Sequence, residues 1–238
     1  MGSLHLASYS NVAVLTGAGI SVASGLKPYR GPGGLWTEGG DVQAATAEGF
    51  AADPGATWRL MGPLREQAAA AAPNAAHVAL AEAEQRATGS FLVVTQNVDG
   101  LHQRAGSENV VEVHGSIFRT RCSNTDCDRP TERDERYAGG LPTCDRCRAP
   151  LRPDVVLFGD AIDVDAEWTI KKALRDCDLF IAIGTSGTVS PASNYVRSAK
   201  YVGARTVLVN LEPMSPANPY FDEERLGPAE ELVPQLFG

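Results

Sequence analysis

The 238-residue chain is poor in lysine and has no long hydrophobic run. Its 29 acidic residues outnumber its 21 basic ones, giving a formal charge of −8, and only four of the basic residues are lysines. Nonspecific binding to nucleic acid or membranes needs clustered basic side chains, so we expect neither partner. No apolar stretch approaches the roughly 18 residues of a membrane-spanning helix, and the first ten residues lack a signal-peptide pattern. We therefore expect a cytoplasmic protein.

The chain also lacks a Gly-x-Ser-x-Gly motif, which argues against covalent hydrolase chemistry. Short apolar runs alternate instead with helical segments. We expect strands at residues 11–16, 91–95, 109–113, 155–158, 179–183 and 205–210, and helices within 53–86 and at 166–175, 190–201 and 228–236. This alternation predicts an α/β fold, a Rossmann-like parallel sheet with helices on both faces.

Glycine and polar residues follow five of the predicted strands, at Gly17, Gln96, His114, Gly184 and Asn210. The carboxyl ends of parallel strands meet at one edge of a sheet, and ligands bind there. We therefore expect these five strand ends to share one site.

The glycines of Gly17-Ala18-Gly19 follow the first strand and precede a predicted helix. They suit a phosphate-binding loop, because glycine lets the backbone approach a pyrophosphate and the helix N-terminus offers N–H groups. Val22 stands where the G-x-G-x-x-G fingerprint has its third glycine. At this point a turn that merely needs glycines is an equal alternative.

Four of the five cysteines form two close pairs, Cys122 with Cys127 and Cys144 with Cys147. Two such pairs supply the four thiolates of a tetrahedral zinc ion and leave no open position, so we predict a structural zinc site. Residues 115–152 hold eight arginines and little apolar sequence, and zinc would stabilise them in place of a core. Cys177, at the start of an apolar strand, is typical of a core residue.

His114 ends a predicted strand, where a histidine with a pKa near neutrality can act as a general base. A lone histidine is more often structural. However, Gln96, Asn97 and Asp99 follow the neighbouring strand, and amides beside a carboxylate suit a carboxamide or a ribose. We interpret the other histidines as structural: His5, His77 and His102.

Several short motifs follow one another over residues 11–229. They are residues 17–25 (GAGISVASG), 29–31 (YRG), 95–102 (TQNVDGLH), 113–115 (VHG), the paired cysteines, 184–186 (GTS) with 191–192 (PA), and 209–210 (VN). In these motifs the chain resembles the sirtuins, which are NAD-dependent protein lysine deacylases. The resemblance implies NAD and one structural zinc ion as cofactors, acyl-lysine proteins or peptides as partners, and a monomer.

The resemblance also implies two domains with a cleft between them. Residues 1–31, 72–116 and 152–238 would form the Rossmann-like NAD-binding domain, and residues 32–71 and 117–151 the small domain with the zinc module. The implied NAD-binding residues are Gly17, Ala18, Gly19, Ser21, Tyr29, Arg30, Gln96, Asn97, Asp99, Gly184, Thr185, Ser186, Asn210, Glu212 and Ala229. His114 and Asn97 would be catalytic, with His114 the base toward the ribose hydroxyls. Val155, Val156, Leu157 and Phe158 match the strand that pairs with the substrate backbone.

Succinyl-accepting members of the family carry a Tyr-x-x-Arg pair in the helix after the cofactor loop. Alignment on Asp53-Pro54 puts Met61 and Leu64 at those positions. This predicts an apolar acyl pocket and argues against a succinyl preference, because a buried carboxylate without a cationic partner is unfavourable. A local gap in the alignment would instead bring Arg65 to the arginine position.

Two other functions stay open from the sequence. A mono-ADP-ribosyltransferase would break the same bond of NAD and differ only in the acceptor. A zinc-binding scaffold with a vestigial Rossmann core would use the arginine-rich cysteine segment. Nicotinamide release that depends on an acylated peptide would separate both from a deacylase.

Overall fold

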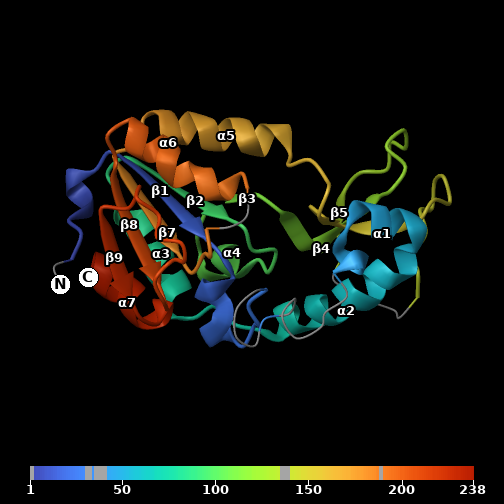
Figure 1. Cartoon of the computed structure of the whole chain (residues 1–238). Helices are drawn as coiled ribbons and strands as arrows, with labels where there is room; N and C mark the ends of the chain where they lie inside the picture. Colours follow the sequence, from blue (N-terminus) through green and yellow to red (C-terminus); the bar gives the residue numbers. More distant parts are fainter. Residues whose placement is uncertain (1–2, 30–33, 35–41, 135–139, 188–189) are drawn as a thin grey trace.

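The larger part of the molecule is a six-stranded parallel sheet (Figure 1). The structure is a computed structural model, and it describes residues 3–29, 34, 42–134, 140–187 and 190–238. In spatial order the strands are β3 (Val110–Glu112), β2 (Ser90–Thr95), β1 (Asn11–Thr16), β7 (Leu179–Ile183), β8 (Arg205–Asn210) and β9 (Glu223–Leu226). The predicted Rossmann-like class is confirmed.

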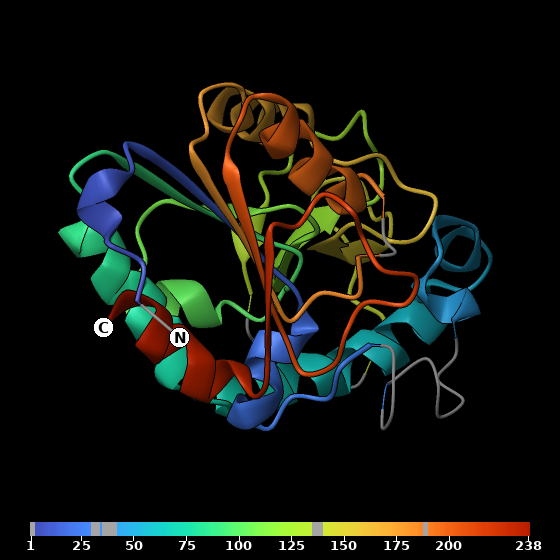
Figure 2. The ribbon, with the colours of Figure 1, turned by 60° about the vertical axis from the view of Figure 1, so that its left-hand side comes forward.

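Apolar side chains bury both faces of this sheet. In β7, Leu179, Ile181 and Ile183 join one core cluster, and the alternating Phe180 and Ala182 join the other. The first face is covered by α3 (Ala75–Arg86) and α7 (Ala229–Phe237), the second by α5 (Val164–Arg175) and α6 (Tyr195–Tyr201) (Figure 1 and Figure 2). Burial on two sides explains why these strands read as continuous apolar runs.

The strand order brings the loops after β1 and β7 together, at the point where the winding of the sheet reverses. Gly17 N donates to Ile183 O at 3.0 Å, and Gly19 N donates to Gly184 O at 2.9 Å. A Cβ at Gly17 would lie 2.7 Å from Gly184 O, and one at Gly19 would lie 2.6 Å from Gly184 Cα. The close contact between the two loops therefore requires both glycines.

The smaller part of the molecule is built on a three-stranded antiparallel sheet. Its strands are β5 (Glu132–Arg133), β4 (Gly115–Cys122) and β6 (Leu151–Val155), and the helices beside it are η3 (Gln43–Ala45), α1 (Ala47–Ala52) and α2 (Pro54–Ala70). Helix α2 donates side-chain hydrogen bonds to both main strands of this sheet. Trp58 Nε1 donates to Leu151 O in β6, and Arg65 Nε donates to Ile117 O in β4, each at 2.7 Å. The domain limits given above stay a prediction.

Some predicted elements need correction. Residues 155–158 are not a strand of the parallel sheet, because β6 ends at Val155 and pairs antiparallel with β4. A short apolar run does not reveal which sheet it joins. The sequence pattern also does not predict β9, since three of its four residues are charged.

The helical predictions differ in detail. The helix expected after Gly17 is the 3-10 helix η2 (Ala18–Ser24), and the one expected from residue 190 begins as the 3-10 helix η4 (Ala192–Asn194) before α6. The segment 53–86 forms two helices, α2 and α3, as expected, and a short helix α4 (Leu101–Ala105) follows β2. Among the described residues, every helix is too short or too polar to cross a bilayer.

Candidate functional site

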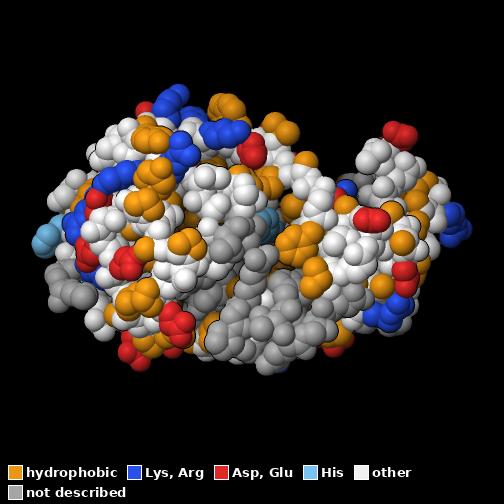
Figure 3. All heavy atoms as spheres, viewed as in Figure 1, with side chains coloured by type: hydrophobic (Ala, Val, Ile, Leu, Met, Phe, Trp, Pro, Cys, Tyr) orange, Lys and Arg blue, Asp and Glu red, His pale blue; other side chains and the backbone are white. Residues whose placement is uncertain are grey.

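A cleft of about 1280 Å³ is lined by residues from both sheets, and the surface is indented between the two parts (Figure 3). On the side of the large sheet its walls include Gly17, Gln96, His114, Gly184 and Asn210. The prediction that five strand ends share one site is confirmed.

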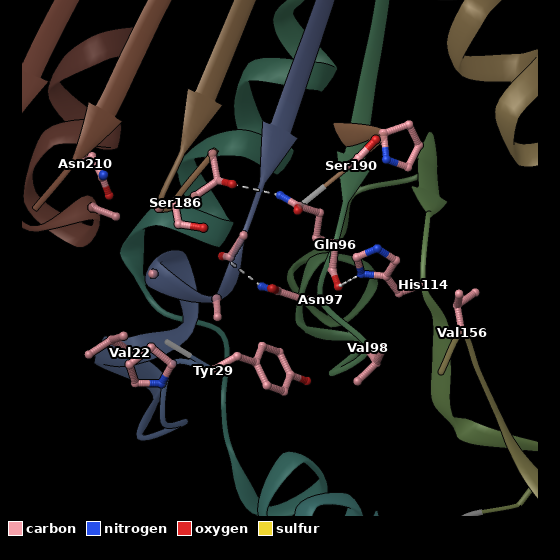
Figure 4. Close-up of a pocket in the computed structure, with 18 of the residues that line it drawn as sticks. Val22, Tyr29, Gln96, Asn97, Val98, His114, Val156, Ser186, Ser190 and Asn210 are labelled. Carbon is pink, nitrogen blue, oxygen red and sulfur yellow. Dashed lines mark hydrogen bonds between the residues drawn. The ribbon is translucent and has the colours of Figure 1, made fainter. Parts of the chain in front are cut away.

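His114 follows β3 and lines the cleft. Its Nδ1 donates a hydrogen bond to the carbonyl oxygen of Gln96 at 2.9 Å (Figure 4). Because this bond places the proton of the neutral ring on Nδ1, the lone pair lies on Nε2. Burial lowers the pKa of His114 below its usual 6.5, and the bond to Gln96 partly opposes this shift. At pH 7 the ring is neutral, and Nε2 can accept a proton.

Asn97 is buried just after β2, and only one of the two polar atoms of its side-chain amide is hydrogen-bonded. Its Nδ2 donates to Gly17 O at 3.1 Å and to Ser21 Oγ at 3.2 Å. The Ser21 hydroxyl in turn donates to Asp99 Oδ2 at 2.7 Å, and burial raises the pKa of Asp99. Asn97 Oδ1 has no hydrogen-bond partner within the described residues. A buried acceptor without a partner indicates a ligand or water that carries an N–H or O–H group.

Two of the histidines interpreted as structural form a buried pair behind the site. The rings of His77 and His102 meet edge-to-face at 4.9 Å, and His102 Nε2 shares a hydrogen bond of 2.9 Å with Thr16 Oγ1. Burial lowers the pKa of His77 to about 4 and that of His102 to about 3. Both rings are therefore neutral at pH 7, and neither lines the cleft.

The four paired cysteines converge beside the small sheet. The Sγ atoms of Cys122 and Cys147 lie 3.4 Å apart, those of Cys127 and Cys144 lie 3.7 Å apart, and all four lie within 4.8 Å of one another. A zinc tetrahedron with bonds of ~2.3 Å has edges of ~3.8 Å. The cluster therefore fits one structural zinc ion. Cys177 is separate and lies in the core of the large sheet.

Acidic partners neutralise much of the arginine-rich segment around this cluster. Arg129 contacts Glu132 at 3.0 Å and Asp145 at 3.2 Å, and Arg146 contacts Asp128 at 2.8 Å. Arg129 and Arg146 therefore form ion pairs within the zinc module and are not part of an unpaired basic patch.

The arrangement of these residues matches a family of known proteins. The model of the Sir2 family matches residues 17–191, which include the loop after β1, His114 and the four cysteines. The chain belongs to the Sir2 family.

Curated relatives are similar to this Sir2 chain over nearly its whole length. A protein of Salmonella typhimurium named NAD-dependent protein deacylase is 43% identical over 233 residues, which cover 94% of this chain and 82% of that protein. NAD-dependent protein deacylase 2 of Pyrobaculum aerophilum is 43% identical over 231 residues, covering 97% of this chain and 91% of that protein.

Solved structures share the whole fold. A Sir2 homologue in complex with NAD superimposes with a TM-score of 0.89 at 34% identity, covering 99% of this chain and 94% of that one. A complex of Sir2 with a p53 peptide and NAD+ gives a TM-score of 0.83 at 29% identity, covering 96% and 92%.

The Sir2 chain brings most of the predicted site residues to the large cleft. Its lining includes Gly17, Ala18, Gly19, Tyr29, Gln96, Asn97, His114, Gly184, Thr185, Ser186, Asn210, Glu212, Ala229, Met61, Val155, Val156, Leu157 and Phe158. Ser21, Asp99 and Leu64 instead line a second cavity of about 200 Å³, which shares Ala18, Tyr29, Asn97 and Val98 with the cleft. Met61 and Leu64 thus line different cavities, although both pack in the same apolar cluster. Arg30 lies outside the described residues.

Sequence reasoning missed some lining residues, among them Asp160, Glu167 and Met214. Asp160 carries a usable signal, because it follows the apolar run 155–158 just as the other site residues follow their strands. Glu167 lies in α5, a helix with an exposed polar side, and only the packing of α5 against the sheet brings it to the cleft. No sequence pattern marks it.

Proposed function

We propose that this Sir2 chain is an NAD-dependent protein lysine deacylase with a preference for apolar acyl chains. The observation that carries the proposal is the presence, at one edge of the sheet, of a proton acceptor, His114 Nε2, and a buried unpaired acceptor, Asn97 Oδ1. The names of the relatives support the reaction class. Bound NAD would supply a ribose carbon that exchanges nicotinamide for the acyl oxygen, and one water would be consumed as the acyl group passes to a ribose hydroxyl, so that the products are nicotinamide, free lysine and O-acyl-ADP-ribose.

The residues around the cleft fit NAD. Asn97 Oδ1 needs a donor, and the nicotinamide end of NAD offers N–H and O–H groups. Asp99 and Ser21, in the adjoining cavity, suit the carboxamide. In the loop after β1, Gly19 N and Ile20 N are already bonded within the chain, so the N–H group of Ala18, at the start of η2, would face the pyrophosphate. The other side of the cleft would hold the adenosine half through Gly184, Thr185, Ser186, Asn210, Glu212 and Ala229.

His114 would act as the general base. Its Nε2 would accept a proton from a ribose hydroxyl, and the carbonyl of Gln96 would hold the ring in place during the transfer. The same hydrogen bond favours the charged ring, so Gln96 also stabilises His114 once it is protonated. Asn97 would orient the ligand beside it.

The substrate backbone would meet no free N–H group at Val156, Leu157 or Phe158. The N–H groups of Val156, Leu157 and Phe158 are already bonded within the chain, to His114 O, Asp160 Oδ2 and Ala45 O. In the described part of the chain, residues 159 and 161 make no backbone hydrogen bond. We therefore place the pairing edge at residues 159–161, while the side chains of 155–158 line the channel for the acyl-lysine.

The lining of the cleft supports an apolar acyl chain. Met61 packs with Ala45, Val98 and Leu157 in one apolar cluster, and all four residues line the cleft. The described lining residues include no lysine or arginine, and they include four carboxylates: Asp160, Glu167, Glu212 and Glu230. Within this described lining a succinyl carboxylate would find no cationic partner, which disfavours its burial.

Arg65 does not supply the missing cation. Its side chain is 1% exposed, donates to Ile117 O at 2.7 Å and to Thr120 Oγ1 at 3.2 Å, and lies over the ring of Trp58 at 5.0 Å. It lines neither cavity. The alignment that places Leu64, and not Arg65, at the arginine position of succinyl-accepting relatives is therefore favoured.

A panel of acetyl-, succinyl- and myristoyl-lysine peptides, assayed with NAD, tests the proposal. We expect turnover of the acetyl or the myristoyl peptide, with the succinyl peptide the poorest of the three. A best rate on the succinyl peptide would contradict the acyl preference alone. Transfer of adenine label from NAD onto protein, without free O-acyl-ADP-ribose, would contradict the deacylase itself and support an ADP-ribosyltransferase.

A further inference from the structure

A buried ion pair holds the turn beside the proposed peptide edge. Arg152 lies in β6 and is 7% exposed, and its Nη2 donates to Asp160 Oδ2 at 2.5 Å. The same Nη2 donates to Val155 O at 3.0 Å, and the guanidinium lies over the ring of Phe50 at 5.3 Å. Arg152 thus joins strand β6, helix α1 and the turn.

The Asp160 carboxylate also shapes the turn itself. Its Oδ2 accepts a second hydrogen bond from Leu157 N at 3.0 Å, and Asp160 N donates to Leu157 O at 2.9 Å. Gly159, inside this turn, has a φ of 92°, which favours glycine. One carboxylate oxygen therefore sets both the shape of the turn and its distance from β6.

The outer side of the turn is fixed by the segment where η3 ends and α1 begins. Phe158 N donates to Ala45 O, and Ala47 N donates to Phe158 O, each at 2.9 Å. With Phe158 held on one side and Asp160 on the other, the backbone N–H groups of residues 159 and 161 are left without a hydrogen bond in the described part of the chain.

We infer that Arg152 and Asp160 are positioning residues for the peptide substrate and not for NAD. This inference rests on the proposed function. The Asp160 side chain is 19% exposed and lines the cleft, whereas the residues assigned to NAD come from the loops after β1, β2, β7 and β8 and from the start of α7. A change in the ion pair would move the peptide edge and leave those loops in place. A buried hydrogen bond to a charged group is strong enough for this role.

Asp160→Asn tests the inference. The amide keeps an oxygen for Leu157 N, but the ion pair with Arg152 becomes a hydrogen bond from the charged guanidinium to a neutral amide oxygen. We expect the KM for an acetyl-lysine peptide to rise by about tenfold or more, while the KM for NAD changes by less than about twofold. The peptide affinity, measured by calorimetry on the folded protein, should fall by the same factor.

Asp160→Asn leaves the charge of Arg152 buried without a counter-charge, which could destabilise the fold. A second variant separates that effect from the loss of positioning. The double variant Arg152→Met/Asp160→Asn removes both charges and keeps the acceptor for Leu157 N. We expect a near-normal melting temperature and the same rise in peptide KM. The matched control is Asp53→Asn, which breaks an exposed pair with Arg59 in the same part of the molecule, and it should change neither KM.

Equal rises in both KM values, or a fall in kcat with both KM values unchanged, would overturn the positioning role. These results are distinct from a failure of the proposed function. In that case the wild-type protein itself would show no NAD-dependent deacylation of any peptide in the panel.

Discussion

The two walls of the cleft are stabilised in different ways. The wall that carries the glycine loops, Asn97 and His114 is the edge of a sheet with apolar cores on both faces. The opposite wall belongs to the small sheet, which has one smaller core against α1 and α2, formed by Ala45, Phe50, Met61, Ala68, Ile117, Phe118, Val155 and Leu157. At the cysteine end of this sheet the buried cluster contains only Cys122, Cys144 and Leu151, and there the four thiols take the place of a core. The comparison indicates that the cofactor side is fixed by two large cores, and the substrate side by one small core together with polar contacts and metal.

The largest expected effect concerns His114, which faces the cleft where the two walls meet. His114→Ala removes the proton acceptor and should lower deacylation by about 10²–10⁴-fold, while both walls stay folded. Product formation with NAD and an acyl peptide measures the rate, and bound zinc and circular dichroism measure the fold. Undiminished turnover in this variant would refute the assignment of the base.

Loss of zinc should separate the two walls most clearly. Cys144→Ser removes one ligand from the cluster, in which Cys144 is fully buried, and a chelator removes the zinc ion itself. Structural zinc contributes directly to folding. We expect hydrogen-exchange protection to fall in β4 and β6 and to persist in β1, β7 and β8. Equal loss in both sheets would show that the walls unfold as one unit.

A substitution in the core of the large sheet should destabilise that sheet and leave the zinc site intact. Phe180 in β7 is 1% exposed, and Phe180→Ala should lower the free energy of unfolding by about 3–5 kcal/mol. The bound zinc should be unchanged. Urea denaturation followed by tryptophan fluorescence, together with zinc content, measures both. A destabilisation below about 1 kcal/mol would contradict the role given to packing in the large sheet.

The buried histidines make the large part sensitive to acid. Burial lowers the pKa of His77 to about 4, so between pH 6.5 and about 4 the unfolded state binds a proton that the folded state does not. The free energy of unfolding should therefore fall as pH falls through this window, by about 3 kcal/mol for His77. His77→Gln should flatten the profile, and the exposed His5→Gln should leave it unchanged. An unaltered slope in His77→Gln would contradict this account.

The smallest effect is expected for the contact between α2 and β6. Trp58→Phe removes the Nε1–H that bonds Leu151 O at 2.7 Å and should lower the stability of the small sheet by about 1–2 kcal/mol. Hydrogen exchange in β6 is the measurement, with β8 as the internal reference. Increased exchange in β8 alone would place the contact outside the small sheet.

The same contrast explains what the sequence could predict. Strands buried on two sides, such as β7, read as apolar runs, and their polar ends located Gly17, Asn97 and His114. The cysteine spacing located the metal cluster for a separate reason, since ligand chemistry requires it. The charged strand β9 and the antiparallel partner of β4 carry no such signal.

The substrate wall was harder to predict because long-range polar contacts hold it. Arg65 and Arg152 are buried through bonds to backbone oxygens in other elements, and no local pattern distinguishes them from surface arginines. For the same reason Leu64 lines the second cavity and not the cleft beside Met61. Helical spacing places two side chains near one face, but the packing of α2 decides which cavity each one reaches.

The most direct test of the central claim is the release of nicotinamide from NAD, measured with and without an acetyl-lysine peptide. The account predicts release that requires the acylated peptide, equals the lysine deacylated, and disappears in His114→Ala. Release that is unaffected by the peptide, or its absence on every acyl-lysine peptide, would contradict the claim.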